Sequence, residues 1–146
     1  MSSKTLKILL VDDNPADVML MKEAIRKSSI SVSLFELGNG QDAIKYLRRL
    51  PPYETATTPD LVLLDLQLPL KSGKEVLREV KSDVLLSSIP IIIMSTSSSC
   101  EDILQSYQLH AASYVVKPAE WVAYLRIISL LHAYWSDVAT LPARNS

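Results

Sequence analysis

The stretch that decides the fold lies near the start of the chain and reads LKILLVDD over residues 6–13. Six mainly apolar residues with little polar alternation are typical of a strand buried on both faces of a parallel sheet. Asp12 and Asp13 follow this run directly, so they are expected at the carboxyl end of the strand. In open α/β sheets that end of the strands carries the site. The stretch therefore predicts an α/β protein with an acidic site at one sheet edge.

Four further apolar runs rich in leucine and β-branched residues occur at residues 32–37, 61–64, 91–94 and 114–116. Segments of helical periodicity lie between them, and their starts carry capping signals. These signals are Asn14-Pro15-Ala16-Asp17, Ser72-Gly73-Lys74-Glu75, Ser99-Cys100-Glu101-Asp102 and Lys117-Pro118, and residues 41–50 supply the remaining helix. Five strands alternating with five helices predict an open five-stranded parallel sheet with helices on both faces.

Composition narrows the function classes. The 146 residues are 48% hydrophobic and 21% charged, with a net charge of −1, which offers no basic field for nucleic acid or anionic lipid. No apolar run reaches membrane-spanning length, and Cys100 is the single cysteine, so neither a disulfide nor a thiolate metal site is expected. The three glycines form no nucleotide-binding motif. We expect one cytoplasmic domain over residues 1–136 and a short tail over 137–146.

The predicted strand ends bring acidic, hydroxyl and amino side chains to one edge of the sheet. Asp12 and Asp13 follow the first strand, Asp65 the third, Ser95 the fourth and Lys117 the fifth. An all-oxygen acidic cluster suits Mg²⁺, because neighbouring carboxylates otherwise repel one another. A carboxylate such as Asp65 can act as a nucleophile toward phosphorus, and Lys117 can neutralise the transferred group. Taken singly, each of these residues is also an ordinary turn, cap or helix start.

These motifs resemble the receiver domain of two-component response regulators. The resemblance rests on Val11-Asp12-Asp13-Asn14, Asp65-Leu66-Gln67-Leu68-Pro69 with Gly73, Ser95-Thr96 and Lys117-Pro118. It implies the flavodoxin-like topology with strand order 2-1-3-4-5. Two segments narrow the resemblance to single-domain regulators that pair with cyanobacterial and bacterial phytochrome histidine kinases. They are Asp12-Asp13-Asn14-Pro15-Ala16-Asp17 and the ending Ala133-Tyr134-Trp135 with Thr140-Leu141-Pro142.

The resemblance implies a role for each site residue. Asp65 would accept the phosphoryl group, and Asp12, Asp13, Asp65 and the backbone carbonyl of Gln67 would bind Mg²⁺, with Asp12 acting mainly through water. Lys117 and Ser95 would hold the phosphoryl group. Tyr114 would be the switch aromatic that responds to Ser95, and the Lys117–Pro118 bond would be cis.

Two positions depart from the commoner pattern of the family. Gln67 replaces an asparagine, which puts the lifetime of the phosphate in doubt. Ser95 replaces a threonine, which puts the strength of its coupling to Tyr114 in doubt.

Output is expected through protein contacts, because the eleven residues after Trp135 are too few for a DNA-binding domain. The last helix carries an apolar arc wider than one sheet face needs, which predicts a second buried surface. We expect a symmetric homodimer through this helix and the preceding strand, with Tyr134 and Trp135 near its centre, although a tail folded over the arc would explain the excess too. The expected interface residues are Tyr124, Ile127, Leu131, Tyr134 and Trp135.

Other functions compete with a phosphorylatable receiver whose partners are a phytochrome-type kinase and an unknown downstream protein. A phosphotransfer enzyme with an aspartyl intermediate would want a second acid at position 67, where Gln67 stands. A flavin- or nucleotide-binding protein would not place Asp12 and Asp13 in its first loop. A degenerate receiver used as a dimerisation scaffold would not need the full set of acids, hydroxyl and lysine. We therefore expect no enzyme beyond self-phosphorylation and self-dephosphorylation.

Overall fold

The fold is an open α/β sheet, seen in a computed structural model that describes residues 5–143. Five parallel strands pair in the predicted order β2-β1-β3-β4-β5, the flavodoxin-like topology. The strands are β1 (Leu6–Val11), β2 (Val32–Leu37), β3 (Leu61–Leu64), β4 (Ile91–Ser95) and β5 (Ser113–Val116). The helices are α1 (Pro15–Lys27), α2 (Gly40–Leu47), α3 (Gly73–Ser82), α4 (Cys100–Gln108) and α5 (Trp121–Ala133), followed by the π-helix η1 (Tyr134–Val138).

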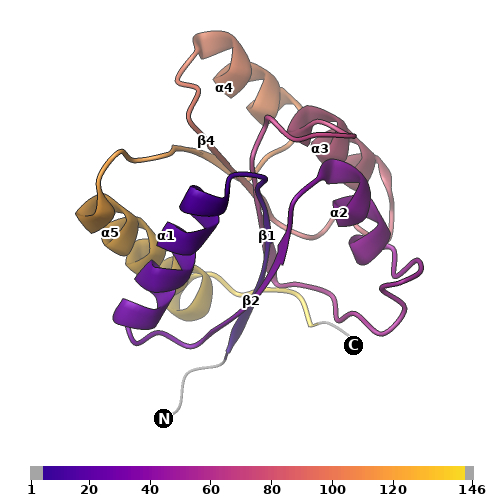
Figure 1. Ribbon diagram of the computed structural model, residues 1–146. Helices are drawn as coiled ribbons and strands as arrows, with labels where there is room; N and C mark the ends of the chain where they lie inside the picture. Colours follow the sequence, from indigo (N-terminus) through magenta and orange to yellow (C-terminus); the bar gives the residue numbers. More distant parts are fainter. Residues whose placement is uncertain (1–4, 144–146) are drawn as a thin grey trace.

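Helices cover both faces of the sheet (Figure 1), with α1 and α5 side by side on one face and α2, α3 and α4 on the other. The helices run back against the strands, so their first turns lie at the carboxyl edge of the sheet. The segment of residues 48–60 leads into the start of β3 at the opposite edge (Figure 1). Among the described residues, no helix has the length and apolar character that crossing a membrane requires.

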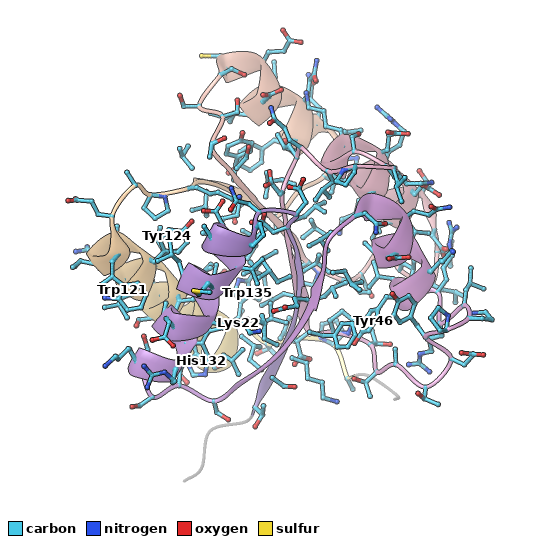
Figure 2. The ribbon with its side chains drawn as sticks, viewed as in Figure 1. Lys22, Tyr46, Trp121, Tyr124, His132 and Trp135 are labelled. Carbon is cyan, nitrogen blue, oxygen red and sulfur yellow. The ribbon has the colours of Figure 1, made fainter. Side chains whose placement is uncertain are left out.

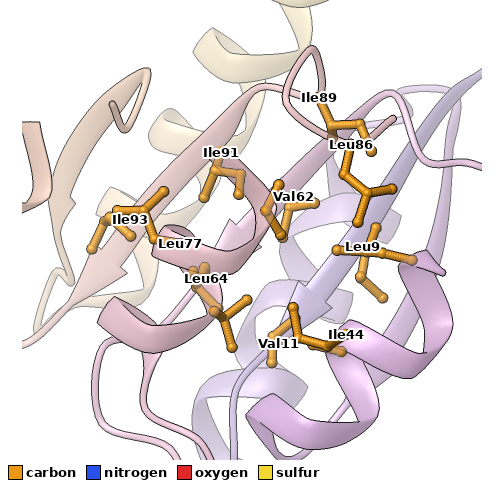
Figure 3. Close-up of a cluster of buried hydrophobic side chains, with 14 of the residues drawn as sticks. Leu9, Val11, Ile44, Val62, Leu64, Leu77, Leu86, Ile89, Ile91 and Ile93 are labelled. Atoms are coloured by element: carbon orange, nitrogen blue, oxygen red, sulfur yellow. The ribbon is translucent and has the colours of Figure 1, made fainter. Parts of the chain in front are cut away.

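The two faces of the sheet carry separate cores, because alternate residues of a strand point to opposite sides. Leu9, Val62 and Ile91 pack toward α2 and α3, in the cluster that Figure 3 shows. Ile8 and Leu63 pack toward α1 and α5. The residues of both clusters are almost fully buried, which explains why β1, β3 and β4 are mainly apolar and show little polar alternation.

The capping signals at three helix starts are confirmed. The Asn14 side chain accepts hydrogen bonds from the first turn of α1, and the Ser99 hydroxyl caps α4 at Asp102 N–H. At α3 the Ser72 hydroxyl accepts from Glu75 N–H, and the Glu75 carboxylate accepts from Ser72 N–H, which completes a capping box. Three of the helices are therefore positioned by local sequence.

The predicted start of the last helix is wrong. Lys117 still pairs with β4, its N–H donating to the Ser95 carbonyl at 2.7 Å, so the chain is extended there. α5 begins at Trp121 with Glu120 as a cap that makes no side-chain hydrogen bond. The helix predicted over residues 41–50 ends at Leu47, and Arg49 beyond it has a positive φ.

Candidate functional site

The first acids of the site follow β1. Asp12 is buried, and its Oδ1 accepts a hydrogen bond from the Asn14 backbone N–H at 2.9 Å. Asp13 points to the surface and makes no hydrogen bond or ion pair with any described residue. The turn into α1 thus fixes one carboxylate and leaves its neighbour free for a ligand.

Asp65 lies directly after β3, beside Asp12 because β1 and β3 are neighbours in register. Its carboxylate is buried, and its Oδ1 accepts a hydrogen bond from the Gln67 N–H at 3.2 Å. The Gln67 side chain is exposed, and its backbone carbonyl stays a predicted metal ligand.

Lys117 reaches into the same place from the end of β5. Its Nζ lies 2.8 Å from an oxygen of each of Asp12, Asp65 and Asp17, and its side chain is only 5% exposed. The predicted pairing of Lys117 with Asp65 is therefore present. Asp17, from the first turn of α1, was not predicted as part of the site.

Burial and ion pairing have opposite effects on the pKa values of Lys117 and Asp12. Burial acts to lower the pKa of Lys117, but the three surrounding carboxylates outweigh it and hold that pKa above its ordinary value. The pKa of Asp12 is raised, because the effect of burial exceeds the lowering by Lys117 and the Asn14 N–H. The lysine is thus held as an ammonium ion beside acids that carry more negative charge than it neutralises.

The acids fit a divalent cation. One oxygen from each of Asp12, Asp13 and Asp65 can be chosen so that all three lie within 4.8 Å of one another. Mg²⁺ prefers oxygen ligands and commonly takes one or two carboxylates while keeping several waters. When bound there, the cation would supply positive charge that neutralises both the acids and a transferred phosphoryl group.

Ser95 and Tyr114, the predicted switch pair, are linked through one loop residue. Ser95 is buried at the end of β4, and its Oγ accepts a hydrogen bond from the Ser97 N–H at 3.2 Å. The Tyr114 hydroxyl donates to the Ser97 carbonyl at 2.8 Å. A movement of the Ser95 hydroxyl would therefore disturb Ser97, and with it the hydrogen bond that Tyr114 donates to Ser97.

The bond between Lys117 and Pro118 is trans, so the predicted cis bond is wrong; the chain has its cis bond, within the described residues, between Pro51 and Pro52. Trans is the lower-energy form of such a bond, and the Lys117 side chain reaches the acids from it.

Tyr124 does not belong with the other predicted interface residues. Its side chain is 2% exposed and packs in the core between α5 and α1, with its hydroxyl 3.4 Å from Asp17 Oδ1. Figure 2 shows it on the side of α5 that faces α1. Tyr134 is 50% exposed, whereas Ile127, Leu131 and Trp135 are partly buried against the core.

The tail lies near one end of the arc, the region that the competing explanation has it cover. Leu141 packs against the same core cluster as Trp135, and both residues line a hollow with Leu6. The apolar surface left open on α5 and η1 is made by Val122, Leu130, Tyr134 and Val138.

The sequence of the chain also matches a known protein family. The response regulator receiver domain matches residues 8–128. The chain belongs to the response regulator receiver family. Response regulator Rcp1 of Synechocystis sp. is 37% identical to it over 136 residues, which cover 93% of this chain and 92% of that protein.

Solved structures give the same result. The phosphorylated cyanobacterial phytochrome response regulator RcpA superposes with a TM-score of 0.90 at 41% identity, covering 96% of this chain and 100% of that one. The Mn²⁺-bound form of Rcp1 gives a TM-score of 0.87 at 36% identity, covering 94% and 99%. The receiver thus resembles phytochrome-linked regulators of two-component signalling, and one such relative holds a divalent ion.

Proposed function

We propose that this receiver accepts a phosphoryl group on Asp65 from a phytochrome-type histidine kinase, with Mg²⁺ as cofactor, and passes the signal on through protein contacts. The observation that carries the proposal is the Lys117 ammonium, 2.8 Å from Asp65 Oδ2 and beside the Asp12–Asp13 pair. A degenerate scaffold has no need of this complete arrangement.

The chemistry follows from positioning and charge. An oxygen of Asp65 forms a bond to phosphorus while the bond between phosphorus and the donor imidazole nitrogen breaks, and that nitrogen takes up a proton from water. Lys117 then pairs with an oxygen of the transferred group. Ser95 offers a hydroxyl at the end of the neighbouring strand, and its movement would release Ser97 and Tyr114.

The proposal is tested by incubating the protein with Mg²⁺ and a small acyl phosphate and measuring intact mass. The wild type gains one phosphate, and Asp65→Asn gains none. Asp60→Asn, at the other end of β3, is the matched control and gains it as the wild type does. Equal labelling of Asp65→Asn would exclude Asp65 as the acceptor.

The kinase is proposed to dock beside the acids on α1. Pro15, Val18 and Met19 line a hollow of about 470 Å³ that also reaches Asp12 and Asp13. Met19 is a large apolar residue that is 66% exposed. An apolar surface next to the phosphoacceptor suits the helices of a kinase, and the likeness to RcpA and Rcp1 supports a phytochrome-type donor.

Met19→Ser separates docking from chemistry. We expect it to slow phosphotransfer from a phosphorylated phytochrome-type kinase by about tenfold, since losing one buried apolar anchor costs roughly 1–2 kcal/mol. Labelling by the small acyl phosphate should not change. The matched control is Val84→Ser, on a remote loop. Unchanged transfer from the kinase would exclude this surface.

We further propose a homodimer through the open face of α5 and η1, where Tyr134 and the exposed Leu130 lie. The partly buried Ile127, Leu131 and Trp135 would support this face from beneath rather than form its centre. Two copies related by a twofold axis would cover the same patch on each other.

A further inference from the structure

Three carboxylates surround the ammonium group of Lys117, which donates hydrogen bonds to Asp17 and Asp65 and forms an ion pair with Asp12. An ammonium has three N–H donors, and three carboxylate oxygens lie 2.8 Å from Nζ, on Asp12, Asp65 and Asp17. The first two belong to the acidic cluster that suits a divalent cation, but Asp17 does not. One of the three partners therefore stands outside the metal and phosphoryl chemistry.

Asp17 is itself held from two sides. Asp17 is the third residue of α1, and its backbone N–H donates a hydrogen bond to the Asn14 side-chain oxygen at 3.3 Å. Its other carboxylate oxygen, Oδ1, lies 3.4 Å from the hydroxyl of Tyr124, which is buried on α5. The carboxylate thus joins α1, α5 and the residue that follows β5 at one point.

We infer that Asp17 is a positioning residue for Lys117, keeping one N–H of the ammonium engaged while Asp12 and Asp65 are used by the cation and the phosphoryl group. This inference rests on the proposed function. When Asp65 carries phosphate and Asp12 serves the cation, Asp17 is the remaining carboxylate of the three. The ammonium then keeps one fixed partner while its other N–H groups change partners.

Removal of the Asp17 charge has a definite consequence. The ammonium would then be shared by Asp12 and Asp65 alone, so it would compete more strongly with a cation for those two acids. Charge-assisted hydrogen bonds are stronger than neutral ones, so an asparagine at position 17 would not replace the carboxylate. Weaker binding of Mg²⁺ and slower phosphorylation of Asp65 should follow together.

The test compares Asp17→Asn with Asp42→Asn. Asp42 is the third residue of α2 and also follows an asparagine cap, so it controls for the effect of an acid in the first turn of a helix. Calorimetric titration with Mg²⁺ should show an affinity about five- to tenfold lower for Asp17→Asn and unchanged for Asp42→Asn. At the same Mg²⁺ concentration, phosphorylation of Asp65 by the acyl phosphate should be slower in Asp17→Asn and unchanged in Asp42→Asn.

Two measurements separate positioning from a merely structural role. In a Lys117→Ala background, adding Asp17→Asn should leave Mg²⁺ affinity within about twofold, because the two residues act as one unit. In metal-free protein, the ¹⁵N-detected ammonium signal of Lys117 should persist in the wild type and in Asp42→Asn and broaden in Asp17→Asn.

An affinity of Asp17→Asn equal to the wild type, or an equal loss in the Lys117→Ala background, would overturn the inference. Failure of the wild type to label at Asp65 would instead remove the proposed function, and the ammonium signal would still report on the Asp17 contact.

Discussion

The hydroxyl of Tyr124 links the core to the charged site at the scale of a single residue. Burial, followed by the negative charge of Asp17, raises the pKa of Tyr124 to about 12. In the unfolded chain a tyrosine ionises near its ordinary pKa of about 10. Between these two values the unfolded state loses its proton while the folded state keeps it, so the free energy of unfolding falls as pH rises.

Tyr124→Phe should remove this dependence. We expect the wild type to lose up to about 2–3 kcal/mol through Tyr124 as pH rises from about 10 to about 12, and the phenylalanine variant to lack that loss. Urea unfolding of both proteins at several alkaline pH values measures the difference between their free energies of unfolding. All other titratable groups are common to the two proteins, so their effects cancel in this difference. Parallel curves for the two proteins would contradict the argument.

The strand-end residues could be predicted, but Asp17 could not. Asp12, Asp65 and Lys117 each follow an apolar run, and parallel strands bring such residues to one edge. Asp17 meets Lys117 across one hundred positions of sequence, because the Lys117 side chain extends from the end of β5 to the first turn of α1. An acid in the first turn of a helix already has a local explanation, so no sequence signal distinguished it.

At the scale of elements, the start of α3 is packed against the backbone of Asp65 and Leu66, directly after β3. A Cβ placed on Gly73 would lie 2.1 Å from the backbone oxygen of Asp65. The helix can begin here only because the residue has no side chain. By contrast, a Cβ on Gly38 would meet nothing within 4 Å.

Gly73→Ala should therefore push α3 away from Asp65. We expect a loss of roughly 1–3 kcal/mol in the free energy of unfolding, as for other overpacked sites, together with slower phosphorylation. Gly38→Ala is the matched control and should change neither quantity by much. Urea unfolding and labelling by the acyl phosphate give both values, and a Gly73→Ala protein as stable as the wild type would refute the packing argument.

Most elements could be predicted because local patterns and tertiary packing agree. The start of α5 differs, since a lysine and a proline favour a helix start locally while β4 keeps Lys117 extended through the Ser95 carbonyl. Because the apolar arc of α5 is wide, the sequence alone does not show which of its residues face the core. Helical periodicity placed Tyr124 on the apolar arc, but only packing against α1 shows that its side of the arc is buried.

For the whole molecule, binding of Mg²⁺ should raise thermal stability, because the acids come together only in the folded sheet. A free concentration ten times the dissociation constant adds about 1.4 kcal/mol. Asp13→Asn should melt like the wild type without the cation, since Asp13 has no partner among the described residues, and should lose most of the rise. Calorimetric melting with and without Mg²⁺ measures this, and an undiminished rise would place the ion elsewhere.

The proposed dimer is also a property of the whole molecule. Tyr134→Ser should shift the protein toward monomer at micromolar concentration, because Tyr134 is half exposed on the open face. Val84→Ser removes an apolar side chain that is 89% exposed on a different surface and should leave the mass unchanged. Sedimentation of the two variants and the wild type measures their mass in solution. A monomeric wild type would contradict the proposed dimer.

The site residues all lie at one edge of the sheet, whereas residues 48–60 run along the other (Figure 1). Glu54 and Thr55 are exposed there and belong to no helix or strand. A fluorescent protein inserted between them would leave Asp65 and its surroundings intact, so this edge offers a place to build a light-emitting reporter of the receiver in living cells.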